Sequence, residues 1–332
     1  MRRSLVLLVT FLLALASYSS AGEKKDKQAE GLALIERARE LSDIRAPGSP
    51  PFRLEAKVEV LGPNGSWIDG TYSLLRLSSE KSREEINLPG YREVRVATGD
   101  KVWQVRNVRY MPLHVFQLRG ALQVQSRLKL EPKETIKKIR ERRHKGSSEK
   151  CTTVKVNEWT ERELCFDEAT GAIVSEKSWK VAYEYSDFLE WRGKVLPRSV
   201  RAREEGQEVV RVKTVEIIDA EAPDLSQFEP PPGAAIKQGC DNPEPAEATE
   251  TQEPVYPDRA KRAGVSGIVS IYAVIGLDGT LHNPTLVRTA GPDLDSSAMS
   301  AVSRWRYRPA MCGGKPVESE TVIDVGYRLY YP

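Results

Sequence analysis

The chain has 332 residues, of which 40% are hydrophobic and 29% are charged, a composition typical of a globular protein with enough apolar side chains for two domain cores. Lysine and arginine together outnumber aspartate and glutamate by only 50 to 47. No large excess of one charge therefore indicates nucleic acid or an acidic substrate as the partner.

The N-terminus has the pattern of an export signal. Arg2 and Arg3 precede an apolar run from Leu5 to Ala16, and the small residues 19–21 follow. We expect residues 1–21 to be a signal peptide cleaved after Ala21, which places the mature chain in the periplasm. The alternative is an uncleaved anchor that holds the chain in the inner membrane, although the run is slightly shorter than the ~20 apolar residues of a spanning helix.

Four cysteines in an exported chain indicate two disulfides, with three connectivities open. Cys151 and Cys165 flank a short polar segment, so they would be cross-strand partners if residues 151–166 form a hairpin. Cys240 would then pair with Cys312 across a long loop. The alternative is that the thiols stay reduced.

The region 29–219 is predicted to be a large, curved antiparallel sheet with helices. Residues 29–42 have apolar side chains at helical spacing, and residues 52–60 alternate between apolar and charged, as in a half-buried strand. Further strand-like runs, separated by glycine-containing turns, occur at 68–74, 83–88, 92–97, 101–105, 151–156, 161–166, 172–185, 196–203 and 208–217. The exception is 131–145, which is charged and has Pro132 near its start, so we expect a helix there.

Residues 220–253 are rich in proline and acidic side chains and are predicted to be a linker. In a polyproline-like conformation this segment would extend over about 110 Å.

The region 254–332 is predicted to be a small α+β domain. A short helix over 258–263 is followed by a strand over 267–277, a hairpin turn and a returning strand over 280–288. A helix after Pro292 presents apolar residues on one side, and residues 323–329 alternate as a last strand. We expect Trp305 to end the buried stripe of this helix and Pro309 to stop the helix.

These C-terminal residues resemble the C-terminal domain of TonB-family energy transducers. The resemblance covers residues 253–332 and combines "PVYPDRAKRAG", a Gly-x-Val strand, an Asp-Gly hairpin and "AVSRWRYRPA" in that order. It implies an α+β domain of two helices and three strands. The motif positions are Tyr256, Pro257, Gly267, Asp278, Gly279, Trp305, Tyr307 and Pro309.

The resemblance also implies a partner. Domains of this family bind a short peptide of an outer-membrane transporter by β-strand addition to the edge of the final strand. Carried over, the contact residues are Thr321, Val322, Ile323, Asp324, Val325, Gly326 and Tyr327, with Glu253 and Val255 as a secondary contact. Typical transducers keep an N-terminal anchor that meets ExbB/ExbD-type motor proteins, and that contact is expected here only if the N-terminus is uncleaved.

The N-terminal region weakly resembles the LolA/LolB type of lipoprotein carrier. That resemblance implies a half-barrel closed by helices around an apolar cavity for acyl lipid. Its candidate lining residues are Phe52, Leu54, Val58, Tyr72, Leu74, Ile86, Val94, Trp103, Tyr183 and Phe188. The alternative is a sheet whose concave side is ordinary packed core.

The sequence lacks the patterns of common enzymes. His114, His144 and His282 lie far apart in the chain, and no nucleophile elbow, P-loop, dinucleotide fingerprint or Cys-x-x-Cys motif occurs. The basic run 139–146 is interpreted as a solvated helix face rather than a phosphate contact. We therefore expect a binding and coupling protein with no catalytic residue, metal or cofactor, or alternatively a lipid carrier.

Overall fold

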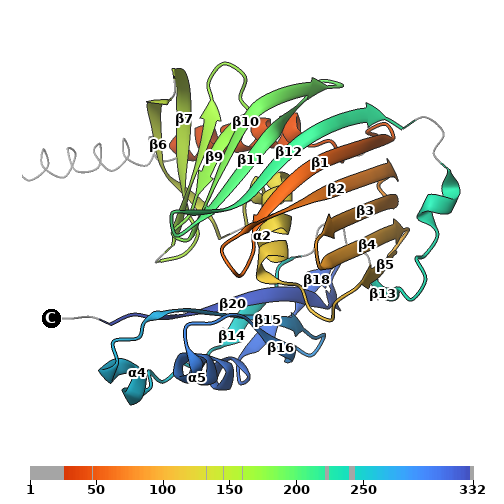
Figure 1. The fold of residues 1–332 in the computed structure, drawn as a ribbon. Coiled ribbons are helices and arrows are strands. Elements are labelled where there is room, and N and C mark those ends of the chain that lie inside the picture. Colours follow the sequence, from red (N-terminus) through yellow and green to blue (C-terminus); the bar gives the residue numbers. More distant parts are fainter. Residues whose placement is uncertain are drawn as a thin grey trace, which may run out of the picture. The chain divides into compact units, whose positions relative to one another are not determined.

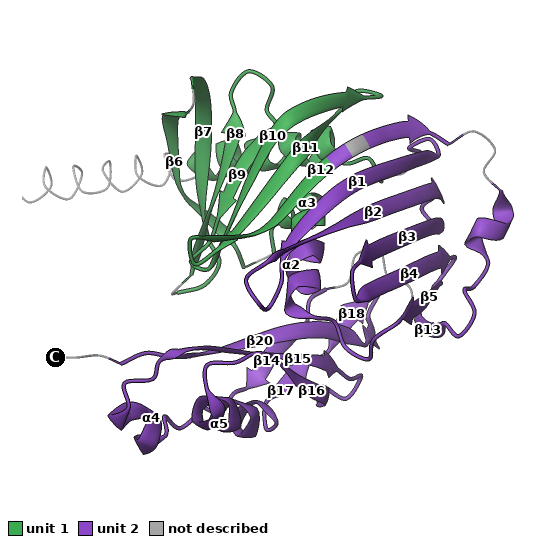
Figure 2. Ribbon diagram, viewed as in Figure 1, with its two compact units in different colours: residues 1–46, 121–213 green, residues 47–120, 214–332 purple. Residues whose placement is uncertain are grey.

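The computed structural model describes residues 26–329, apart from 47, 132, 145, 159, 221–223 and 239–243. The predicted signal 1–21 lies outside the described residues. No helix in the described part of the chain has the length and apolar character needed to cross a bilayer. The chain divides into two compact units (Figure 2): residues 1–46 with 121–213, and residues 47–120 with 214–332, called unit 1 and unit 2 below.

Unit 1 combines an N-terminal helix over residues 26–42 with antiparallel strands. Its strands are β6 (Thr135–His144), β7 (Ser147–Lys155), β8 (Glu161–Asp167), β9 (Ile173–Lys177), β10 (Val181–Trp191), β11 (Lys194–Glu204) and the first part of β12 (Gln207–Asp219). The short helix α3 (Val124–Arg127) precedes β6. Hydrogen bonding joins the strands in the order β11-β10-β9-β8-β7-β6.

The predicted helix over 131–145 is wrong, because residues 135–144 form strand β6. The basic side chains of this segment reach across β7 to glutamates of β8: Lys137 pairs with Glu161, and Arg140 pairs with Glu163 at 2.5 Å. These cross-strand ion pairs and the ladder with β7 favour the extended conformation over the local helical preference of a charged segment.

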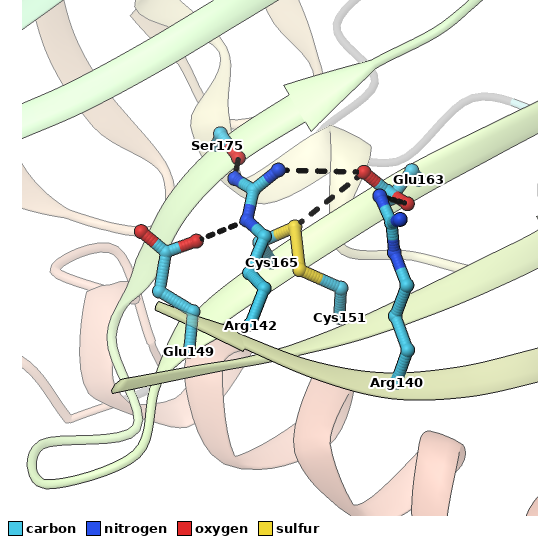
Figure 3. The surroundings of a disulfide bond; sticks show 7 residues. All are labelled: Arg140, Arg142, Glu149, Cys151, Glu163, Cys165 and Ser175. Carbon is cyan, nitrogen blue, oxygen red and sulfur yellow. Dashed lines mark hydrogen bonds and ion pairs between the residues drawn. A yellow bond between two sulfur atoms is a disulfide. The ribbon is translucent and has the colours of Figure 1, made fainter. Parts of the chain in front are cut away.

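The predicted disulfide between Cys151 and Cys165 is confirmed. The two residues lie directly opposite each other on β7 and β8, with their Cα atoms 4.0 Å apart. Figure 3 shows Arg142 beside this disulfide, with its guanidinium 2.7 Å from Glu149 and 3.7 Å from Glu163. Cys312 is disulfide-bonded as well, and its predicted partner Cys240 lies outside the described residues.

Unit 2 contains a sheet with the strand order β13-β5-β4-β3-β2-β1 (Figure 1). The bounds are β1 (Phe52–Leu61), β2 (Trp67–Ser78), β3 (Lys81–Leu88), β4 (Tyr91–Thr98), β5 (Lys101–Arg106) and β13 (Ala235–Gln238). Helix α2 (Leu113–Leu122) follows β5, and the 3-10 helix η1 (Leu225–Phe228) packs on β3 and β4. Around Phe228, the buried residues Leu75, Val94 and Val96 form an apolar cluster on one face of the sheet.

The segment 220–253 is not a free extended linker. It contributes η1, strand β13, which pairs with β5, and strand β14 (Glu247–Glu250), which pairs with β17 (Arg306–Arg308). Lys237 lies opposite Val102, and Glu247 lies opposite Arg308. Backbone pairing therefore holds this Pro-rich segment at two places.

The C-terminal part of unit 2 has the predicted two helices and three-stranded sheet. The helices are α4 (Asp258–Arg262) and α5 (Pro292–Val302), and the sheet order is β16-β15-β20, with β15 (Gly267–Ile275), β16 (Leu281–Arg288) and β20 (Ser319–Tyr327). The short strands β18 (Ala310–Cys312) and β19 (Lys315–Val317) form a separate hairpin. The core consists of Ala260, Val269, Ile271, Leu294, Ala298, Val302, Ile323, Val325 and Tyr327.

The interpretation of Trp305 and Pro309 as the end of a helix is wrong. Helix α5 ends at Val302, and residues 306–308 form strand β17. The backbone N–H of Tyr307 donates to the carbonyl of Gly279, and the Trp305 Nε1–H donates to the carbonyl of Gln252. The ladder with β14 and the hydrogen bond to Gly279 thus hold residues 306–308 in an extended conformation.

Candidate functional site: strand β20 and the charge cluster beside it

Strand β20 is the last strand of the three-stranded sheet. It pairs with β15 along its full length, from Ser319 opposite Ile275 to Tyr327 opposite Gly267. In the described part of the chain no other strand pairs with it, so its second edge has no backbone ladder. Such an edge is a template for an incoming extended segment.

The side chains of β20 alternate between two environments. Ile323, Val325 and Tyr327 are buried in the C-terminal core. On the other face, Asp324 accepts a hydrogen bond from the buried hydroxyl of Ser270, and Gly326 is exposed. Thr321 and Val322 are half-buried. The core side chains fix the strand, so its free edge is held in an extended conformation before any partner arrives.

The Tyr256-Pro257 motif anchors the entry to this domain. The Tyr256 ring packs edge-on against Tyr327 with ring centroids 5.2 Å apart, and its hydroxyl donates to the carbonyl of Val265 at 2.5 Å. The structure therefore brings Tyr256 to the end of β20. Glu253 and Val255, the predicted secondary contacts, are exposed, with Val255 76% exposed.

A cluster of buried charges lies beside β20, and sequence reasoning missed it. The Glu320 carboxylate accepts hydrogen bonds from Arg106 at 2.6 Å, from the Tyr272 hydroxyl at 2.8 Å and from Lys237 at 3.3 Å. Burial alone would raise the pKa of Glu320, but the hydrogen bond and charge of Arg106 and the charge of Lys237 outweigh it and lower the pKa to about 2. Glu320 is therefore ionised at neutral pH.

Glu93 on β4 is the second centre of this cluster. Its side chain is only 1% exposed and lies 2.8 Å from Arg119 of α2 and 3.4 Å from Arg106. Tyr91 and Gln104 donate hydrogen bonds to it. Burial raises the pKa of Glu93, but the two arginines overcome this and lower it to about 2.

The candidate cavity residues do not form one group. Phe52, Leu54, Val58, Tyr72 and Leu74 lie together on one face of β1 and β2, where the Tyr72 hydroxyl donates to Glu84 at 2.9 Å. Of the two further residues on neighbouring strands, Ile86 lies opposite Tyr72 and shares this face, whereas Val94 belongs to the apolar cluster around Phe228 on the other face.

Trp103, Tyr183 and Phe188 lie away from that group. Trp103 lies opposite Val96, a member of the cluster around Phe228. Tyr183 and Phe188 belong to unit 1, where the Arg127 guanidinium carbon lies 3.3 Å from the centroid of the Tyr183 ring and Phe188 is 37% exposed.

A hollow of about 460 Å³ lies in unit 1, between the N-terminal helix and residues 128–130. Its lining includes Leu32, Ile35, Leu128 and Leu130, together with the charged side chains of Glu36, Arg39 and Lys129. None of the predicted cavity residues lines it. Sequence periodicity did not identify this hollow, because it assigned Leu32 and Ile35 simply to the apolar stripe of a helix.

Comparison with known proteins finds similarity in the C-terminal part. Residues 252–329 match the family model described as "Gram-negative bacterial TonB protein C-terminal". The chain is 28% identical over 86 residues to Protein TonB of Vibrio cholerae, covering 26% of this chain and 35% of that protein. It is 29% identical over 77 residues to Protein TonB of Xanthomonas campestris pv. campestris, covering 23% of this chain and 34% of that protein.

Solved structures similar to this chain include LolA-like proteins. A LolA superfamily protein from Nitrosomonas europaea has a TM-score of 0.39 at 11% identity, covering 57% of this chain and 94% of that one. A putative outer membrane lipoprotein-sorting protein domain from Vibrio parahaemolyticus has a TM-score of 0.42 at 9% identity, covering 60% and 97%. The matched segment spans about a third of the curated relatives, so the similarity to the TonB family is that of residues 252–329, which carry the fold and the motifs of its C-terminal domain.

Proposed function

We propose that this chain is a non-enzymatic protein of the bacterial envelope that binds a partner by β-strand addition to the free edge of β20. The single observation that carries the proposal is this edge, which has no strand partner in the described residues and belongs to a strand fixed from behind by Ile323, Val325 and Tyr327. The partner's main chain would hydrogen-bond to β20, and its alternate side chains would give selectivity.

The match to the TonB C-terminal family supports the choice of partner. We propose an outer-membrane transporter, which the chain would engage from the periplasm to support energy-dependent transport. An additional contact with ExbB/ExbD-type motor proteins would require that the N-terminal segment stays in the inner membrane.

Strand addition at the β20 edge predicts that every second backbone N–H of the partner contributes to its affinity. An extended periplasmic peptide of an outer-membrane transporter, titrated into the full chain by calorimetry, should lose at least tenfold in affinity when alternate backbone nitrogens are N-methylated. Methylation of the intervening nitrogens should have little effect, because adjacent N–H groups of a strand point to opposite edges. A scan in which every methylated peptide binds like the unmodified one would exclude strand addition.

A second function is favoured by the hollow in unit 1. Its apolar lining fits an acyl chain and Lys129 offers a cation for an anionic head group, as a lipid or lipoprotein carrier would need, whereas Arg39 is paired with Glu36 of the same lining. In unit 2, by contrast, the face that carries Tyr72 also carries Glu84 and Glu93, which is unsuitable for an acyl chain.

Co-purification tests this second function. Organic extracts of the full chain, purified from a Gram-negative host, should contain acyl lipid at near-stoichiometric amounts in mass spectrometry. A Leu32→Glu variant, which places a carboxylate in the hollow at a position that is 42% exposed, should lose at least three quarters of it. The matched control Leu277→Glu, at an exposed position of unit 2, should retain it. Extracts of the unmodified chain without acyl lipid would contradict the carrier function and leave the docking function untouched.

A further inference from the structure

Glu320 has two structural roles, because it is a residue of β20 and also a member of the buried charge cluster. Its side chain is 17% exposed and contacts Arg106 of β5, Lys237 of β13 and Tyr272 of β15. All of these residues belong to unit 2. The strand proposed to receive a partner is thus joined by a buried ion pair to the sheet formed by β1–β5 and β13.

Arg106 is shared between two carboxylates. Its Nη2 donates to Glu320 at 2.6 Å, and its Nε lies 3.4 Å from Glu93. The contact with Glu93 is an ion pair without a hydrogen bond, since Nε of Arg106 has no hydrogen-bond partner in the described residues. Nε of Arg106 is thus a buried donor that still lacks a hydrogen bond, and the carboxylate of Glu93 lies next to it.

Arg119 extends the cluster to helix α2. Its guanidinium lies 2.8 Å from Glu93 and 3.9 Å from Glu84, and only 12% of its side chain is exposed. Arg106 and Arg119 thus share the carboxylate of Glu93 from opposite elements. Arg106 faces Oε2 of Glu93 and Arg119 faces Oε1, so a change in how Arg106 binds Glu93 changes the charge that Arg119 of α2 meets.

We propose that the Arg106–Glu320 ion pair couples the occupancy of the β20 edge to the packing of helix α2. Partner addition on β20 would change the position of Glu320, Arg106 would shift its contact toward Glu93, and Arg119 would hold α2 less tightly. The effect is reciprocal, so loosening α2 would change the affinity of the β20 edge by the same factor. The step from the bound partner to Glu320 rests on the proposed function, whereas the step from Glu320 to α2 does not.

Hydrogen exchange in the free full chain tests the link without any partner. Glu320→Gln, which keeps the shape of the side chain but removes its charge, should speed amide exchange in α2 residues 113–120 by about tenfold. The matched control is Glu318→Gln, an exposed glutamate two residues earlier in the chain, which should leave that exchange unchanged. Equal exchange of α2 in the two folded variants would overturn the proposal. If Glu320→Gln does not fold, Glu320→Asp, which keeps the charge and shortens the reach, serves in its place.

The effect of a bound partner on α2 is tested in the same chain with a transporter peptide. Saturating peptide should change α2 exchange several-fold in the unmodified chain, and this change should disappear in the Glu320→Gln variant while it persists in Glu318→Gln. Peptide that binds without changing α2 exchange would overturn the coupling. Peptide that does not bind the unmodified chain would refute the proposed function instead, and the variant comparison in the free chain would still decide the link.

Discussion

Glu93→Ala should lower the free energy of unfolding by about 3–5 kcal/mol, because it leaves Arg106 and Arg119 buried without their shared carboxylate. Chemical denaturation of the full chain measures this loss. The matched control Glu80→Ala removes a glutamate at the exposed turn between β2 and β3 and should change the free energy by less than about 0.5 kcal/mol. A loss for Glu93→Ala as small as that of the control would mean that the cluster does not stabilise unit 2.

Glu93 also makes the free energy of unfolding depend on pH. The pKa of Glu93 is about 2 in the folded chain and 4.5 as a reference value, so the unfolded state takes up its proton first as the pH falls. The stabilisation is complete above about pH 4.5 and is lost as the pH falls toward 2. A Glu93→Gln variant should therefore lose less stability than the unmodified chain between pH 5 and pH 3. Parallel pH profiles of the two proteins would contradict this assignment.

Gly279→Ala should lower the free energy of unfolding by about 3–5 kcal/mol, combining backbone strain with overpacking. Gly279 has a φ of 76°, and a Cβ there would lie 1.9 Å from the carbonyl oxygen of Tyr307. The control is Gly314→Ala, because Gly314 has a φ of 78° and no atom within 4 Å of a Cβ. The control should cost only about 1–2 kcal/mol. Equal losses in thermal or chemical denaturation would show that contact with Tyr307 contributes nothing.

Local patterns predicted the parts of the fold that depend on near neighbours. The Cys151–Cys165 pair follows from a short polar segment between two strand-like runs. The C-terminal helices and strands follow from hydrophobic periodicity and from the Asp278-Gly279 turn. In these segments the local preference and the tertiary structure agree, and the family resemblance is strongest in the same region.

Contacts between different strands explain why two of the sequence-based predictions were wrong. Residues 135–144 have no apolar alternation, so their strand conformation depends on the backbone ladder with β7 and on ion pairs with glutamates of β8. The 220–253 segment has the composition of a linker, yet it supplies strands to two other elements. In both cases the deciding partners are distant in the sequence.

The charge cluster could not be predicted from alternation in β4. Val94 and Val96 assign one face of this strand to the core, which leaves Glu93 to the solvent by the usual rule. Both faces of the strand are in fact covered, because η1 packs on one side and Arg119 of α2 reaches the other. A buried glutamate is stable there only because two arginines from different elements meet it.

The pairing of β13 with β5 affects how readily the C-terminal domain re-forms its contact with Arg106. Residues 239–243 alone separate Gln238, paired with Lys101, from Glu244, whose backbone bonds to Met311. Six Cα–Cα steps span at most about 20 Å. While β13 stays paired, the C-terminal domain therefore remains at an effective concentration in at least the millimolar range near the β5 edge. Even a weak Arg106–Glu320 contact would then re-form by an intramolecular step after each opening, and an external competitor would have to match that local concentration.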